Sequence, residues 1–143
     1  MTPLTWRFAS QTDIRLLAAL NRQLNEDEGH RYIMSVAELA DRMRAFLAAE
    51  YRAALFERDG RLVAYALWAQ RGDGFYLRQF YVVREARRSG IGRAAMAILR
   101  KDVWPQNVRL YLEVLSANQR GLAFWRALGF ADYALTLEMM PKP

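Results

Sequence analysis

The spacing of apolar residues changes several times between strict alternation and helical periodicity, which predicts a chain that mixes strands with helices. Residues 4–9 alternate apolar and polar positions and predict a short first strand. Two segments with apolar residues three and four positions apart follow, and each opens on a capping box, Ser10-x-x-Asp13 and Ser35-x-x-Glu38. A helix is therefore expected after each box.

The middle of the chain contains the signals of a β-hairpin. Apolar segments 53–56 and 62–68 flank Asp59-Gly60, and Asp-Gly between apolar runs is a strong hairpin signal. A second glycine-rich turn leads into residues 75–83, where aromatic and β-branched side chains favour a strand. Three successive antiparallel strands are therefore expected.

Residues 84–92 form a turn between the strand at 75–83 and a helix, because apolar residues then recur on one helical face at Ile91, Ala94, Ala95, Ile98 and Leu99. The first N–H groups of a helix lack internal partners and carry partial positive charge, so such a turn can bind an anion. Gly90 and Gly92 have no Cβ, which lets a phosphate approach the main chain. Taken alone, the pattern is equally compatible with an ordinary turn whose arginines are solvated.

The second half of the chain predicts one further strand and helix and a closing segment. Trp104-Pro105 ends the helical pattern, and residues 108–114 alternate as a strand with one apolar face. The helical connection favours parallel pairing of this strand with the one at 75–83. Residues 118–128 predict the last helix, and residues 130–140 alternate loosely and predict one or two closing strands.

The resulting order of elements is β-α-α-β-β-β-α-β-α-β. It predicts an α+β or mixed α/β fold, with a mostly antiparallel sheet, flanking helices and one parallel βαβ unit. The length of 143 residues is that of one domain of common size, so residues 1–143 are expected to form a single domain.

Composition and charge exclude several kinds of site. The chain has no cysteine, which excludes disulfides, thiolate nucleophiles and cysteine-ligated zinc, and its single histidine, His30, excludes a histidine-based metal cluster. We therefore expect no metal. The net charge of +6 allows a nucleic acid or a polyanionic cofactor and requires neither. Since the chain shows no signal peptide and no membrane span, a cytoplasmic protein without a membrane partner is expected.

Two blocks of sequence resemble the GNAT superfamily of N-acyltransferases. Residues 87–92, Arg-Arg-Ser-Gly-Ile-Gly, follow a predicted strand and are similar to the Arg/Gln-x-x-Gly-x-Gly/Ala motif that binds the pyrophosphate of acyl-CoA in that superfamily. Further on, Leu-Glu-Val at 112–114, then Asn118, Phe-Trp at 124–125 and Leu-Gly-Phe at 128–130, resembles its downstream strand, helix and turn. The resemblance implies a V-shaped splay between the two parallel strands, and acetyl-CoA as co-substrate.

The resemblance also implies where acetyl-CoA binds. Its pyrophosphate is expected on the main-chain N–H groups of residues 88–93, and its pantetheine arm along the preceding strand, whose splayed N–H and C=O groups need partners. Asn118 is implied as a polar contact to this arm, and Asn is also a preferred N-cap residue. The implied co-substrate residues are Phe80, Val82, Arg87, Arg88, Ser89, Gly90, Ile91, Gly92, Arg93, Asn118 and Trp125.

Transfer to an amine requires a base. An alkyl amine has a pKa of about 10.4 and is almost entirely protonated at neutral pH, so a basic side chain or a water relay must remove a proton. Glu113 lies on the mixed face of its predicted strand, and it is similar in position to the base of family members that acetylate protein N-termini. The alternative is that Glu113 pairs with Arg109 across the sheet.

The departing thiolate raises the question of an acid. Where much of the family has a tyrosine that protonates the thiolate, this chain has Trp125, whose indole has no proton to give and is expected to pack against cofactor or substrate. Tyr133 is the first candidate for this acid, with Tyr81 and Tyr111 behind it. Unassisted departure is the alternative, because a thiol pKa of about 8.5 is close to neutral.

The acceptor is suggested only by an acidic stretch. Glu26, Asp27 and Glu28 precede His30 in the loop between the first two helices, either as a solvated loop or as a lip that attracts a cationic amine. The expected function is direct transfer of an acetyl group from acetyl-CoA to a primary amine, on a small cationic molecule or on a peptide or protein. The alternative is an acyl-CoA-binding regulatory module without turnover. A nucleic-acid partner is not expected, and the resemblance makes pairing into a homodimer through closing strands plausible.

Overall fold

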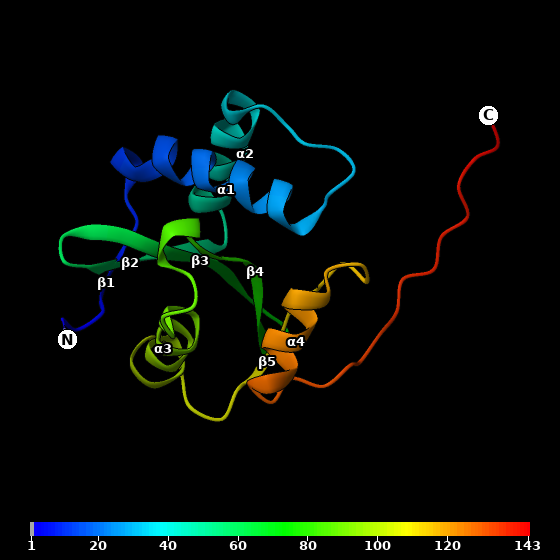
Figure 1. The fold of residues 1–143 in the computed structure, drawn as a ribbon. Helices are drawn as coiled ribbons and strands as arrows, with labels where there is room; N and C mark the ends of the chain where they lie inside the picture. The colour runs from blue at the N-terminus through cyan, green and yellow to red at the C-terminus, as the bar shows by residue number, and fades with distance from the viewer. Residues whose placement is uncertain (1) are drawn as a thin grey trace.

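The computed structural model describes residues 2–143, and its centre is a five-stranded sheet in the order β1-β2-β3-β4-β5 (Figure 1). Neighbouring strands are antiparallel from β1 to β4, whereas β5 lies parallel to β4. The predicted mixed fold with one parallel βαβ unit is confirmed. The strands are β1 (Thr5–Phe8), β2 (Tyr51–Arg58), β3 (Arg61–Arg71), β4 (Gly74–Val82) and β5 (Arg109–Tyr111).

Helices cover both faces of this sheet. The helices α1 (Ile14–Glu28) and α2 (Val36–Ala48) pack on one face, and α3 (Ile91–Ile98) packs on the other (Figure 1). The helix α4 (Gln119–Ala127) lies beside β5. Each face has its own buried apolar cluster, one centred on Leu17, Leu55 and Tyr65 and the other on Phe56, Met96 and Leu99.

Short-range sequence signals position several of these elements. At the start of α2 the Glu38 main-chain N–H donates to Ser35 Oγ at 3.1 Å, as the capping box predicts. Asp59 and Gly60 have φ values of 55° and 72°, the left-handed pair that a tight hairpin turn requires. The box at Ser10 precedes a 3₁₀ turn (Gln11–Asp13) instead of opening α1 directly.

The C-terminal segment differs from the prediction. Residues 130–143 form no helix or strand and continue from α4 as an extended chain along the outside of the body (Figure 1). The expectation of one or two closing strands at 130–140 is wrong for the chain as described, because a strand must pair with another strand and this segment pairs with none among residues 2–143, although the outer edge of β5 is open. The strand expected at 108–114 is also shorter, since β5 ends at Tyr111.

Two features are absent from residues 2–143. None of their helices combines the length and the apolar character that crossing a bilayer requires. The same residues contain no group of three or more His, Cys, Asp or Glu side chains that could hold a metal ion.

Candidate active site

The strands β4 and β5 separate soon after they begin. Their register pairs Gly74 with Arg109 and Tyr76 with Tyr111, after which β5 ends while β4 continues to Val82. Beyond Tyr76, this edge of β4 has no strand beside it within residues 2–143. The predicted V-shaped splay is therefore present, and it exposes main-chain groups that need partners.

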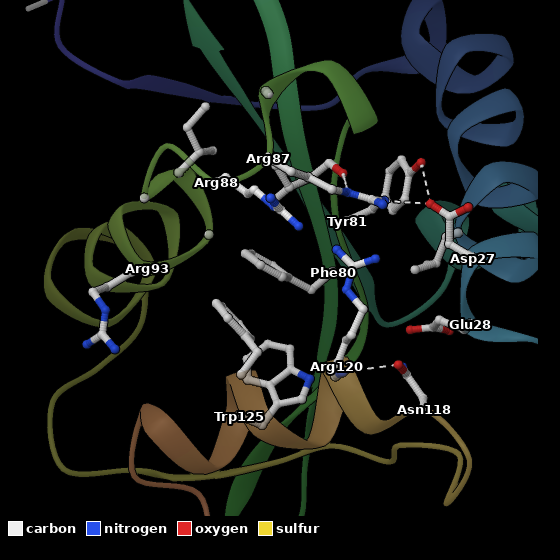
Figure 2. A pocket seen from close by; sticks show the side chains of 18 residues that line it. Asp27, Glu28, Phe80, Tyr81, Arg87, Arg88, Arg93, Asn118, Arg120 and Trp125 are labelled. Carbon is white, nitrogen blue, oxygen red and sulfur yellow. Dashed lines mark hydrogen bonds and ion pairs between the residues drawn. The ribbon is translucent and has the colours of Figure 1, made fainter.

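A cavity of about 440 Å³ occupies the splay, bordered by β4, the turn that follows it, the end of α1 and the start of α4 (Figure 2). This volume lies in the range of cofactor and small-molecule sites. Of the co-substrate residues expected from the sequence, Ser89 is the only one that does not line the cavity. The structure therefore brings together residues from β4, α3 and α4 that are far apart in sequence.

The turn between β4 and α3 has a fixed backbone conformation. Arg88 and Gly90 have φ values of 64° and 78°, and Gly90 is the N-cap of α3. Ser89 Oγ donates to the Ala86 carbonyl at 2.6 Å, so this hydroxyl holds the turn instead of facing the cavity. The first turn of α3 borders the cavity at Ile91 and neighbouring residues, so the partial positive charge of the helix N-terminus lies at the cavity.

Packing gives a second reason for glycine at position 92, besides letting a phosphate approach the main chain. A Cβ at this position would lie 3.0 Å from Cε1 of Phe124, closer than an ordinary carbon–carbon contact. The Phe124 ring cannot move aside freely, because it stacks on Phe80 with 6.1 Å between ring centroids and meets Trp125 edge to face at 4.8 Å. Glycine here allows α3 and α4 to approach each other at the cavity.

Asp27, at the C-terminal end of α1, binds two arginines of the turn (Figure 2). Arg87 Nη2 lies 2.5 Å from Asp27 Oδ2, and Arg84 Nη2 lies 2.8 Å from Oδ1. Burial acts to raise the pKa of Asp27, but the hydrogen bonds from Arg84 and Arg87 outweigh it and the pKa is lowered. Arg87 also donates from Nε to the Val82 carbonyl at 3.1 Å, so it is held on both sides.

The helix α4 closes the opposite wall. Asn118 caps it, its Oδ1 accepting the Gly121 main-chain N–H at 3.0 Å, which is the capping role that the sequence allowed. Trp125 packs edge to face on Phe80 and Phe130, as a wall of the cavity. Arg120 extends from the start of α4 toward Phe80 (Figure 2) and forms no ion pair with any described residue.

Glu113 lies outside the cavity lining but beside the splay. Its Oε1 accepts the hydroxyl of Tyr76 at 2.8 Å, in place of the pairing with Arg109 that the sequence left open. Burial, followed by this hydrogen bond and the charge of Glu113, raises the pKa of Tyr76 to about 12. The phenol therefore stays protonated at neutral pH and orients the carboxylate.

The candidate acids are spread over the molecule. Tyr133 is 89% exposed on the extended C-terminal segment and lies near Arg109, 5.4 Å from guanidinium to ring, so the structure does not bring it to the cavity. Tyr111 stacks on Tyr76. Tyr81 lines the cavity, and its hydroxyl donates to Gln23 and Asp27 at 3.2 Å each. Burial, and next the charge of Asp27, raises the pKa of Tyr81.

The acidic stretch is divided among several partners. Asp27 and Glu28 line the cavity, whereas Glu26 does not and instead pairs with Arg84 and Arg22. His30 Nε2 lies 2.9 Å from Glu28 Oε1. The charge of Asp27 is thus used to hold the turn, and Glu28 is the acid of this stretch that faces the cavity with no arginine bound among the described residues.

Sequence reasoning missed Arg120, Phe124 and Leu24 as lining residues, and it considered Tyr81 only as an acid. Arg120 follows the candidate Asn118 by two positions at a helix start, and a positive charge at that place was the available signal. No sequence signal could have indicated Leu24 of α1, because no local pattern connects this residue to the turn after β4.

Comparison with known proteins agrees with this geometry. Three solved structures similar to this chain are the aminoglycoside N-acetyltransferase AAC(6')-Iy in complex with CoA, an acetyltransferase from Thermus thermophilus, and a predicted acetyltransferase from Clostridium acetobutylicum with acetyl-CoA. The identities are 14%, 18% and 19%, with TM-scores of 0.74, 0.75 and 0.67. The matches cover 100%, 92% and 96% of this chain and 97%, 90% and 96% of those chains. These likenesses show a shared fold.

No curated protein matches the chain in sequence. The model of the acetyltransferase (GNAT) family, in contrast, matches residues 15–130, which include the sheet from β2 to β5, the splay and all four helices except the first residue of α1. The chain therefore belongs to the acetyltransferase (GNAT) family, and the protein is an enzyme of that family.

Proposed function

We propose that this enzyme transfers the acetyl group directly to a primary amine, with acetyl-CoA held in the cavity between β4, α3 and α4. The observation that carries the proposal is the convergence, on one cavity, of the unpaired edge of β4 and the N-terminus of α3. An extended pantetheine arm can hydrogen-bond to the unpaired edge of β4, and a pyrophosphate can bind at the N-terminus of α3. No acyl-enzyme is expected, since the chain has no cysteine and no evident activated nucleophile.

The positive charges of the cavity fit a pyrophosphate. Arg88 and Arg120 both line it, and neither is ion-paired with a described residue, so their charge is available to an anion. Arg87 is engaged by Asp27 and shapes the turn more than it supplies free charge. The main-chain N–H groups of Ile91 and its neighbours complete the site.

For the amine, the geometry supports Glu113 as the base. Its carboxylate lies at the edge of the splay and is oriented by Tyr76 at 2.8 Å, on the side of the sheet opposite α3. For the departing thiolate, Tyr81 is better supported than Tyr133, because Tyr81 lines the cavity and Tyr133 is 89% exposed elsewhere. Proton transfer by a positioned group requires reach before it requires the right pKa.

The extended C-terminal segment supports a homodimer. Large apolar side chains stand at alternate positions of this segment and are almost fully exposed: Tyr133 at 89%, Leu135 at 83%, Leu137 at 89% and Met139 at 95%. The outer edge of β5 is unpaired within the described chain. A strand-like segment and an open edge in one molecule can each be completed by a second copy.

Release of free thiol from acetyl-CoA tests the proposal, with a panel of polyamines, aminoglycosides, amino acids and peptides, and with thermal protection by acetyl-CoA measured in the same samples. We expect amine-dependent release and protection in the wild type. Arg120→Gln should weaken CoA binding about tenfold, as loss of one charge-assisted contact does. Arg126→Gln is the matched control on α4, since Arg126 pairs with Asp132 outside the cavity.

Each other outcome has a definite meaning. Protection without release from any amine would point to a binding module or to an acceptor outside the panel. The absence of both would contradict the placement of acetyl-CoA in this cavity. Release that is unchanged at every pH in Glu113→Gln would remove Glu113 as the base.

A further inference from the structure

Two arginines lie on the α1/α2 face of the sheet, away from the acetyl-CoA cavity, without an acidic partner. Arg42 is on α2 and Arg78 is on β4. Neither forms an ion pair with any described residue, whereas Arg71 at the end of the neighbouring strand pairs with Glu50 at 2.9 Å. Among residues 2–143, Arg78 forms one side-chain hydrogen bond, and its acceptor is neutral: the Tyr51 hydroxyl, at 3.2 Å.

Both guanidinium groups lie within cation–π distance of the same aromatic ring, that of Phe46. The Cζ atom of Arg78 lies 4.7 Å from the ring centroid of Phe46, and that of Arg42 lies 5.4 Å from it. Arg78 occupies a bulge, because β3 pairs Leu67 with Gln79 and Trp68 with Leu77 and so leaves Arg78 without an opposite residue. Bulges re-aim side chains and are frequent beside active sites.

This arrangement is unfavourable unless something compensates it. The side chain of Arg42 is partly buried and its Nε is buried with no hydrogen-bond partner among the described residues. Burial, and next the charge of Arg78, lowers the pKa of Arg42. Two like charges near one ring repel, and an anion that binds both guanidinium groups would offset this repulsion.

The arginine pair lies close to the proposed base. Arg78 follows Tyr76 on β4 by two residues, roughly 7 Å along an extended strand, and its charge acts to lower the pKa of Tyr76. Tyr76 in turn donates to Glu113 at 2.8 Å. One ligand of moderate length can therefore place an amine at Glu113 and an anionic group at Arg78.

We infer that the acceptor is an amine that also carries an anionic group, a carboxylate or a phosphoryl group, bound by Arg78 and Arg42 while its amine reaches Glu113. Guanidinium groups bind both kinds of anion in a bidentate manner. The inference rests on the proposed amine transfer and narrows its substrate class. It disfavours polyamines, because their second positive charge would meet the arginine pair.

Matched acceptors test the inference. The panel contains ω-amino acids with short and long carbon chains, the aminoalkylphosphonates of the same lengths, and the uncharged amides of the same amino acids. We expect kcat/KM for the acid or the phosphonate to exceed that for the amide about tenfold or more in the wild type, as a charge-assisted contact implies. The carboxylate and phosphonate series distinguish the two anionic groups.

Substitutions locate the preference. Arg78→Gln and Arg42→Gln should each reduce the preference for the charged acceptor about tenfold or more, the loss of one charge-assisted hydrogen bond. Arg44→Gln is the control, since Arg44 is on the same helix as Arg42 but is exposed and paired with Asp41. Thermal protection by acetyl-CoA should be equal in the wild type and all three variants, which shows that they fold and that the co-substrate site is intact.

Equal use of charged and uncharged acceptors, or a preference that survives both substitutions, overturns the inference and leaves the amine transfer standing. If no member of the panel is acetylated, thermal protection by the same compounds in the presence of CoA decides. Extra protection by the acids or phosphonates that is lost in Arg78→Gln supports the inference. The absence of extra protection overturns it. Failure of acetyl-CoA to protect the wild type would instead contradict the proposed function.

Discussion

Single residues of this site have partners that are distant in sequence. Gly92 of α3 lies against the ring of Phe124 of α4, and Tyr76 of β4 donates to Glu113 beyond β5. The first contact is possible because glycine has no Cβ. The second depends on the proton of the phenol. Each contact can therefore be tested by a change of a single group.

Gly92→Ala should lower the free energy of unfolding by about 1 kcal/mol, because overpacking costs about 1–3 kcal/mol and helix formation returns about 0.5–1 kcal/mol. In the background of Phe124→Leu, where the ring is gone, the same change should instead stabilise by a few tenths of a kcal/mol. Urea unfolding of the wild type, the two single variants and the double variant measures both values. A stabilising Gly92→Ala in the wild type would contradict the contact.

The phenol of Tyr76 predicts a dependence on alkaline pH. Its pKa is raised from 10.0 to about 12 in the folded protein, so its contribution to stability is complete below about pH 10 and is lost as the pH rises toward 12. Over that interval the free energy of unfolding should fall by roughly 2 kcal/mol more in the wild type than in Tyr76→Phe. Urea unfolding at a series of pH values measures this difference.

Tyr32→Phe is the control for that series, since the Tyr32 side chain is 74% exposed and lies outside both buried apolar clusters. It should follow the wild type. Parallel curves for wild type and Tyr76→Phe would show that the phenol does not sense folding.

At the scale of elements, the C-terminal end of α1 holds the turn between β4 and α3. Asp27 accepts from Arg84, Arg87 and Tyr81, which come from the turn and from β4 itself. The turn has little regular structure of its own, beyond a 3₁₀ segment at Arg84–Ala86. Contacts to α1 therefore replace the internal hydrogen bonds that a helix or strand would supply.

Asp27→Asn should lower the free energy of unfolding at pH 7 by about 1 kcal/mol, a value reduced for partial exposure of these groups. The pKa of Asp27 is lowered from 3.8, so its contribution is present above that pH and is lost as the pH falls through the lower folded value. Wild type and variant should therefore converge in urea unfolding as the pH falls below 3.8 and through the lowered pKa of Asp27.

Asp41→Asn is the matched control, because the Asp41 side chain is 82% exposed in its pair with Arg44. Such a change should stay within about 0.5 kcal/mol. A constant difference between wild type and Asp27→Asn from neutral to strongly acidic pH would show that the ion pairs do not carry the effect.

At the scale of the whole molecule, the sheet and its helices pack into a buried core, whereas the C-terminal segment does not take part in it. Two packed faces bury the core, yet residues 131–143 lie outside both apolar clusters. Glu138 and Met140 contact Arg31 of the loop between α1 and α2, and Arg109 lies near Tyr133. Alternating exposed apolar residues of this kind mark a segment that pairs elsewhere.

Removal of residues 131–143 should convert the proposed homodimer into a monomer, as measured by light scattering after size-exclusion chromatography. Leu135→Glu with Leu137→Glu should do the same, because charged residues block pairing of strands. Thr136→Ser is the control, since it leaves the apolar side unchanged. A wild type that is monomeric at tens of micromolar would contradict the proposed pairing.

Local interactions explain what could be predicted. The Asp59-Gly60 hairpin, the Ser35 cap and the strand-to-helix turn at Gly90 depend on residues adjacent in sequence, and all three are present. The parallel β4–β5 pair follows from the helix that connects the strands. The two blocks around these elements were also sufficient to identify the family, now shown by the match over residues 15–130.

The sequence by itself thus determined the elements and their order up to the last helix, the mixed sheet and the turn where acetyl-CoA is expected to bind, but not the state of the closing segment. Only the tertiary structure decided that Asp27 binds the turn, that Tyr76 orients Glu113, that Arg42 and Arg78 share one ring, and that the closing segment stays open. Each of these depends on which distant segments meet. Neither periodicity nor local propensity carries that information, because both describe only neighbours along the chain.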